Sequence, residues 1–166
     1  AFSLSSPSGR RTGGTRRPFT LAEAQKGGQH DIVMNGREVY RHAVKRMTEA
    51  AEKVLALAGR IKEDVALVIP HQANLRIIET VREKLGLREE QVFVNVDRYG
   101  NTSAASVGIA LAEAVDTGRV KVGDRIVFVA FGAGFTSGAV ALTWTADPAD
   151  GARARDVVPT ASVRAP

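Results

Sequence analysis

Hydrophobic and polar residues begin to follow a regular pattern only from about residue 35 onward. Between Asn35 and Gly59, apolar residues recur every three or four positions, the spacing of an amphipathic helix. Asn35 and Glu38 form a plausible capping pair at the start of this helix. Residues 65–69 are a continuous apolar run, as expected for a strand covered on both faces of a sheet. A helix followed by a buried strand is therefore predicted.

Helix-like and strand-like patterns alternate through the rest of this region. The expected elements are a helix over 73–85, a strand over 91–96, a helix over 103–115 capped by Thr102 or Ser103, and strands over 126–130 and 138–144. Alternating elements imply parallel strands joined by helical crossovers, and the last two strands imply an antiparallel pair. The sequence predicts a layered α/β domain with a mixed sheet.

The two ends of the chain lack this periodicity. Residues 1–33 are rich in Ser, Gly and Arg and are expected to form an irregular opening or linker. The folded domain is expected over 34–145, and residues 146–166 offer little to bury, which predicts a disordered tail. The chain begins with Ala rather than Met, which is consistent with a processed or excised piece.

Composition narrows the classes of function. Among the 166 residues, 44% are apolar and 25% are charged, as in a soluble globular protein, and no apolar run suggests a membrane span or a signal peptide. A cytoplasmic location without membrane association is expected. The net charge of +5 favours an acidic partner, but aromatics make up only 5% and no nucleic-acid motif is present. Cysteine is absent and the histidines lack metal-ligand spacing, so neither a disulfide nor a metal site is expected.

Two polar residues follow expected strands at the sheet edge where ligands gather in α/β proteins. His71 comes after the strand at 65–69, and Asn101 comes after the strand at 91–96. A neutral imidazole and a carboxamide can aim hydrogen-bond donors at one carbonyl oxygen and stabilise negative charge there. The alternatives are a loop histidine with satisfied hydrogen bonds and an asparagine that serves a turn or cap.

A glycine-rich segment at residues 131–138 is a third candidate. Its backbone N–H groups could converge on an oxyanion, and a plain hairpin connection is the alternative. A dinucleotide-binding fingerprint is not supported, because the third glycine is misplaced and a strand rather than a helix follows.

Together these motifs resemble the C-terminal half of β-ketoacyl-acyl carrier protein synthase III, an acyltransferase with a thiolase-like fold. The resemblance lies in Pro-His-Gln-Ala-Asn at 70–74, Tyr-Gly-Asn-Thr-Ser at 99–103 and the segment 130–138, in the family's order. It implies that the full protein condenses an acyl-CoA starter with malonyl-acyl carrier protein by decarboxylative Claisen condensation and so initiates fatty acid synthesis. It also implies a homodimer with no cofactor beyond the coenzyme A thioester substrate.

The resemblance assigns roles to matching positions. His71 and Asn101 would be the His and Asn of a Cys-His-Asn triad, and the loop formed by Gly132, Ala133 and Gly134 would give a second oxyanion hole. Ala133 stands where the family usually has glycine, and Arg37 where it often has Asn. The implied substrate-binding residues are Phe131, Gly36, Arg37, Ala73 and Asn74, and the implied carrier-protein docking residues are Arg76, Arg41 and Lys84. A solvated helix face is the alternative for the last three.

The family's nucleophilic cysteine lies in an N-terminal half, and this chain contains no cysteine. The resemblance therefore implies that an N-terminal half carrying the thiol is a necessary partner, and that this chain alone is inactive. Two other functions stay open: a starter-unit ketosynthase of a polyketide pathway, and a non-catalytic remnant that binds carrier protein.

Overall fold

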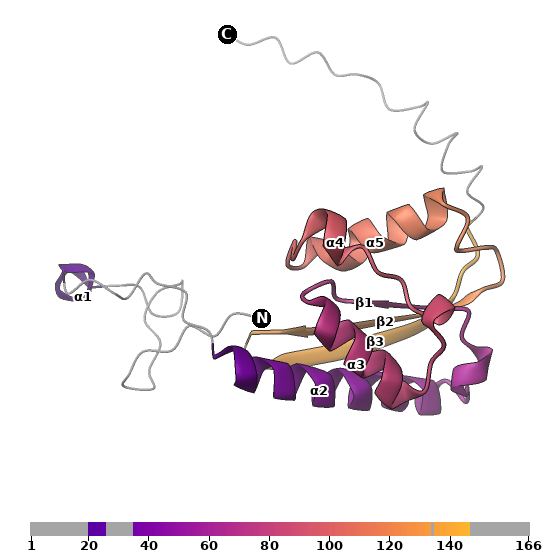
Figure 1. The fold of residues 1–166 in the computed structure, drawn as a ribbon, viewed down its shortest axis with the longest axis horizontal. Helices are drawn as coiled ribbons and strands as arrows, with labels where there is room; N and C mark the ends of the chain where they lie inside the picture. The colour runs from indigo at the N-terminus through magenta and orange to yellow at the C-terminus, as the bar shows by residue number, and fades with distance from the viewer. Residues whose placement is uncertain (1–19, 26–34, 134, 147–166) are drawn as a thin grey trace, which may run out of the picture.

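A computed structural model describes residues 20–25, 35–133 and 135–146, and in it a mixed sheet lies between helices (Figure 1). Strand β1 (Leu67–Pro70) is parallel to β2 (Arg125–Gly132), and β2 is antiparallel to β3 (Thr136–Thr143), in the order β1-β2-β3. Helices α2 and α3 cover one face of the sheet, and α4 and α5 lie on the other (Figure 1). The expected mixed sheet with a final antiparallel pair is confirmed.

The helices account for most of the remaining described residues. They are α1 (Leu21–Gln25), α2 (Gly36–Leu57), α3 (Leu75–Leu85), α4 (Val96–Tyr99) and α5 (Ala105–Asp116), with the 3-10 turns η1 (Lys62–Asp64) and η2 (Glu89–Gln91). Helix α1 lies inside the stretch expected to be irregular. Residues 1–19, 26–34 and 147–166 lie outside the described part, so the domain boundaries stay a prediction. No helix among the described residues is long and apolar enough to cross a membrane.

Side-chain and glycine caps fix the ends of α2 and α3. Asn35 Oδ1 accepts a hydrogen bond from the Glu38 N–H at 3.2 Å, as the sequence predicts. Asn74 Oδ1 accepts from the Arg76 N–H at 3.0 Å, so α3 begins two residues later than expected. Gly86 ends α3 with a φ of 62°, a left-handed conformation that favours glycine.

Two apolar clusters lie on the two faces of the sheet. Because successive strand residues point to opposite faces, Val68 packs into the cluster with α2 and α3, whereas Leu67 and Ile69 pack into the cluster with α5. Strand β2 divides in the same way, with Val127 on the first side and Ile126 on the second. Burial on both faces explains the continuous apolar run in β1.

The strand expected over residues 91–96 is wrong. Val92 makes one isolated parallel bridge to Val68, after which the chain leaves the sheet and enters α4. The side chain of Gln72 forms hydrogen bonds with the backbone that follows Val92. Its Nε2 donates to the Phe93 carbonyl at 3.0 Å, and its Oε1 accepts from the Asn95 N–H at 2.9 Å. A side-chain amide thus replaces the hydrogen bonds that would have extended the strand.

The expected cap of α5 is also wrong. Ser103 has a φ of 54°, which lies outside the right-handed helical region, and no side chain caps the helix. The backbone carbonyls of Thr102 and Ser103 instead accept bonds from the N–H groups of Ala105 and Ser106. This turn places Ser106 on the first turn of α5, at the sheet-facing side, where it is 1% exposed.

Candidate functional site

A cavity of about 340 Å³ lies beyond the carboxyl ends of β1 and β2. His71 and Asn101 both line it, together with Phe131, Gly132 and Ala133 at the end of β2. The other lining residues are Ser103, Ala104, Val107, Ala130, Thr136, Ser137 and Gly138. Three separate sequence motifs therefore meet at one site. Gly134 lies outside the described residues.

His71 is held by its backbone and by one ring nitrogen. Its N–H donates to the Val129 carbonyl at 2.8 Å, which continues the pairing of β1 with β2. Its Nδ1 lies 2.6 Å from the hydroxyl oxygen of Ser106, and its Nε2 has no hydrogen-bond partner among the described residues. Burial lowers the pKa of His71 below its ordinary value, so the ring is neutral at pH 7. A neutral ring with Nε2 available can form a hydrogen bond with a ligand in the cavity through that nitrogen.

Asn101 is exposed and stands in a tight turn. Its Oδ1 accepts a hydrogen bond from the Ser103 N–H at 2.9 Å, the turn role that was the alternative interpretation. Because a backbone N–H only donates, this bond fixes the oxygen and leaves Nδ2 to donate elsewhere. Asn101 follows α4 rather than a strand. Gly100 joins them with φ 64° and ψ −161°, angles that are essentially restricted to glycine.

The glycine-rich segment is a hairpin that also borders the cavity. Strands β2 and β3 stay paired as far as Gly132 and Thr136, and the Thr136 hydroxyl donates to the Ala133 carbonyl at 3.2 Å. The hairpin alternative therefore describes the connection correctly. Phe131 is buried, and its ring lies 5.1 Å from that of Phe135. Phe131 thus adds an apolar surface to the cavity.

A buried polar network, which the sequence pattern does not reveal, supports the loop that carries His71. The Gln72 N–H donates to the Ser106 hydroxyl oxygen at 3.2 Å, and Gln72 Nε2 also donates to the Pro70 carbonyl at 2.9 Å. Asn95 Nδ2 donates to Glu113 at 2.8 Å. Neither Gln72, inside the Pro-His-Gln-Ala-Asn stretch, nor Ser106, inside an alanine-rich helix, stands out in the sequence as a buried polar residue.

The four remaining candidates for substrate binding do not line this cavity. Gly36 and Arg37 are exposed at the first turn of α2, Asn74 is exposed and caps α3, and Ala73 is half-buried beside it. Their roles stay predictions. No group of His, Asp and Glu side chains within the described ranges is placed to hold a metal ion.

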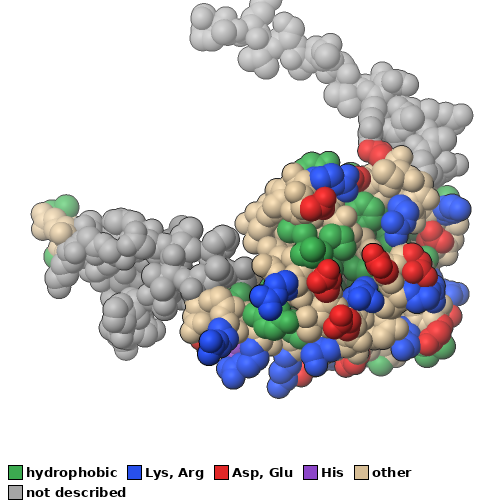
Figure 2. Space-filling view, viewed as in Figure 1, with side chains coloured by type: hydrophobic (Ala, Val, Ile, Leu, Met, Phe, Trp, Pro, Cys, Tyr) green, Lys and Arg blue, Asp and Glu red, His purple; other side chains and the backbone are tan. Residues whose placement is uncertain are grey.

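The three docking candidates are exposed on helices α2 and α3. Arg41 lies on α2, and Arg76 and Lys84 lie on α3. The guanidinium of Arg76 lies 6.0 Å from the ring centre of Tyr40, which links the two helices. Figure 2 shows Lys and Arg side chains gathered along the edge of the molecule formed by α2, with Asp and Glu side chains among them. The docking role stays a prediction.

Comparison with known proteins gives one consistent result. Residues 55–144 match the family described as 3-oxoacyl-[acyl-carrier-protein] synthase III, C terminal. The β-ketoacyl-[acyl-carrier-protein] synthase III of Roseiflexus sp. (strain RS-1) is 50% identical over 134 residues, which cover 81% of this chain and 40% of that protein. The chain thus spans about two fifths of the length of the curated relatives it matches.

Solved structures agree. The synthase III of Thermus thermophilus superposes with a TM-score of 0.68 at 54% identity, over 70% of this chain and 36% of that chain. The priming β-ketosynthase of the R1128 polyketide pathway superposes with a TM-score of 0.65 at 41% identity, over 70% and 35%. The thiolase-like fold is confirmed, and the chain belongs to the β-ketoacyl-acyl carrier protein synthase III family, whose C-terminal part it matches.

Proposed function

We propose that this chain supplies the decarboxylating part of the active site of a β-ketoacyl-acyl carrier protein synthase III. The observation that carries the proposal is that His71 and Asn101, from separate segments, line one cavity. Each has a nitrogen with no hydrogen-bond partner among the residues that the structure describes. The relatives are named for synthesis on acyl carrier protein. We propose a malonyl thioester as the substrate class.

The thioester carbonyl oxygen of malonyl-acyl carrier protein would accept bonds from Nε2–H of His71 and Nδ2–H of Asn101. The bond between the carboxylate carbon and Cα then breaks, carbon dioxide leaves, and the electron pair moves into an enolate. Both donors stabilise the negative oxygen that forms. Because burial lowers the pKa of His71, the ring is neutral and would offer Nε2–H as a hydrogen-bond donor.

The enolate carbon would attack an acyl group held as a thioester on a cysteine, and the thiolate would leave. Backbone N–H groups of Gly132, Ala133 and Gly134 are proposed to stabilise that second carbonyl. The chain has no cysteine, so the thiol must come from another segment. We expect the chain to condense nothing without that segment, because attack on the acyl donor requires a thiolate.

The remaining roles rest on family membership and charge. Gly36, Arg37, Ala73 and Asn74 are proposed to contact the pantetheine arm. Carrier proteins are acidic, and Arg76, Arg41 and Lys84 provide exposed positive charge on a chain of net charge +5. A cytoplasmic homodimer of the complete enzyme, with an acyl-CoA starter and initiation of fatty acid synthesis, belongs to the same proposal.

A second candidate function is the priming step of a polyketide pathway. The R1128 priming ketosynthase is 41% identical to this chain, with a TM-score of 0.65. The same donor pair would serve either pathway, so the identity of the starter acyl group separates the two functions.

A chimeric enzyme tests the proposal. The matching segment of the Roseiflexus relative is replaced by residues 35–146 of this chain, and condensation of acyl-CoA with malonyl-acyl carrier protein is measured. We expect the chimera to be active. His71→Ala in the chimera should lower kcat on the order of a hundredfold, as for removal of an oxyanion donor. His42→Gln, a change of the other described histidine, should leave the rate near that of the parent.

Full activity of the His71→Ala chimera would show that the assigned role is wrong. A folded chimera that binds carrier protein but condenses nothing would favour the non-catalytic remnant. A panel of starter acyl-CoA thioesters then separates fatty acid initiation from polyketide priming.

A further inference from the structure

Ser106 lies in the interior directly behind the ring of His71. It is on the first turn of α5 and is 1% exposed. Its hydroxyl oxygen lies 2.6 Å from His71 Nδ1 and accepts a bond from the Gln72 N–H at 3.2 Å. Within the described part of the chain, these two groups are the hydrogen-bond partners of the hydroxyl.

The number of donors decides which way the Ser106–His71 bond runs. The hydroxyl has one proton to donate and two lone pairs to accept with. The Gln72 N–H already uses one lone pair. If His71 Nδ1–H also donated to the hydroxyl oxygen, the serine proton would be buried without an acceptor, which native interiors rarely permit. If the serine proton points to Nδ1, every group in the cluster is satisfied.

We propose that Ser106 is a positioning residue that donates its hydroxyl proton to Nδ1 of His71 and thereby keeps the ring proton on Nε2. A neutral imidazole carries one proton, so an accepting Nδ1 requires a protonated Nε2. Nε2 is the nitrogen available to the cavity. Ser106 therefore determines whether the ring presents a donor or a lone pair to a ligand.

This choice matters because, as the proposed function requires, the ligand atom is a carbonyl oxygen that becomes negative. A lone pair on Nε2 would repel that oxygen, whereas Nε2–H stabilises it. The Gln72 N–H uses one of the two lone pairs of Ser106, and the reverse orientation is disfavoured because it leaves the buried hydroxyl proton without an acceptor among the described residues.

The tautomer can be measured without substrate or activity. The 166-residue chain is labelled with ¹⁵N-histidine, and long-range proton–nitrogen correlations show which ring nitrogen carries the proton. The sequence has three histidines, so single substitutions assign the signals. The expected result is His71 with a protonated Nε2, an unprotonated Nδ1, and a hydroxyl proton that correlates with Nδ1.

Three variants sharpen the test. Ser106→Ala should allow a measurable fraction of the Nδ1–H form, and Ser106→Thr, which keeps the hydroxyl, should preserve the wild-type tautomer. Ser137→Ala removes an exposed hydroxyl from the same cavity and should leave the tautomer of His71 as in the wild type. A wild-type ring protonated on Nδ1 would overturn the proposal, as would a Ser106→Ala ring that keeps the wild-type tautomer unchanged.

Failure of the proposed function would give a different result from failure of the Ser106 proposal. In the chimeric synthase, Ser106→Ala should lower kcat on the order of tenfold or more with little change in KM, and Ser106→Thr should restore it. A chimera without condensing activity, in a chain whose His71 carries its proton on Nε2, would refute the function and leave the role of Ser106 intact.

Discussion

Replacing Gln72 with alanine should destabilise the domain and disturb the site together. Gln72 is 1% exposed, and its side chain makes three hydrogen bonds to backbone: Nε2 to the carbonyls of Pro70 and Phe93 at 2.9 and 3.0 Å, and Oε1 from the Asn95 N–H at 2.9 Å. All three bonds are buried. The substitution leaves three backbone groups without partners and far from solvent.

The size of the effect follows from these three groups. A buried polar group left unpaired costs about 1–3 kcal/mol, so three such groups should lower the free energy of unfolding by about 3–9 kcal/mol. A water that entered the space of the lost amide would reduce the cost towards the lower figure. At roughly 3 °C per kcal/mol for a domain of this size, the melting temperature should fall by at least roughly 9 °C.

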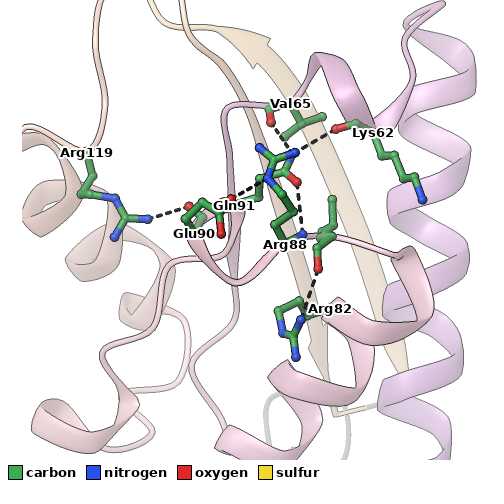
Figure 3. A network of polar contacts seen from close by, with 8 residues as sticks. Lys62, Val65, Arg82, Arg88, Glu90, Gln91 and Arg119 are labelled. Atoms are coloured by element: carbon green, nitrogen blue, oxygen red, sulfur yellow. Dashed lines mark hydrogen bonds and ion pairs between the residues drawn. The ribbon is translucent and has the colours of Figure 1, made fainter.

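Gln91 offers a matched control at the other end of β1 (Figure 3). It is 4% exposed and also makes three hydrogen bonds to backbone: to the carbonyls of Lys62 and Val65 at 3.2 and 2.8 Å, and from the Arg88 N–H at 3.2 Å. One of these bonds is fully buried and two are partly buried. Gln91→Ala should therefore cost less, about 2 kcal/mol.

Urea unfolding followed by far-ultraviolet circular dichroism measures both costs, and the ring signals of His71 report on the site. Gln72→Ala should shift those signals, while Gln91→Ala should leave them at their wild-type positions. A loss below about 1 kcal/mol in Gln72→Ala would refute the hydrogen-bond reasoning, since each unpaired group should cost at least that much. Equal shifts of the His71 signals in both variants would refute the local role of Gln72.

Three further predictions concern charge, the donor on Asn101 and the core. Burial lowers the pKa of His71 in the folded chain, so the unfolded chain binds more protons below about pH 6.5. The free energy of unfolding, measured in urea at several pH values, should therefore fall as the pH drops through that point, and His71→Gln should flatten this slope. Asn101→Asp keeps the oxygen that accepts from the Ser103 N–H but loses the amide donor; in the chimera it should lower kcat on the order of a hundredfold at an unchanged melting temperature. Met47→Ala, at a position 1% exposed, should cost about 2–5 kcal/mol in the urea experiment.

Periodicity and capping residues predicted much of the fold because those signals are local. The apolar spacing of α2 and the pair Asn35 and Glu38 placed that helix correctly. The strand at 91–96 failed for a non-local reason: the groups that would have paired in it are taken by Gln72, from a segment that the local pattern does not include. Apolar content alone cannot distinguish a strand from an extended segment bonded to a side chain.

The sequence predicted residues that line the cavity but not the buried residues that hold them in place. His71 was found because a buried strand ends just before it. Asn101 was found from the strand expected at 91–96, which does not form, and it follows α4 instead. The helix cap expected at Ser103 failed because its φ of 54° depends on the turn that contains Asn101. Ser106 gave no signal of its own, since a serine in an alanine-rich helix is compatible with many environments. Its significance appears only when its hydroxyl is found 2.6 Å from His71.

One side chain links the two segments that carry the donors. His71 is fixed by the end of β1, whereas Asn101 belongs to the segment that leaves the sheet after residue 92. The Gln72 side chain forms hydrogen bonds with the backbone of both segments: with Pro70 in the first, and with Phe93 and Asn95 in the second. Two donors can stabilise one oxygen only when both lie within hydrogen-bond distance of it, so a small shift between the segments would disable the pair. Gln72 does not line the cavity, yet its side chain helps to hold the two segments at the spacing that the donor pair requires.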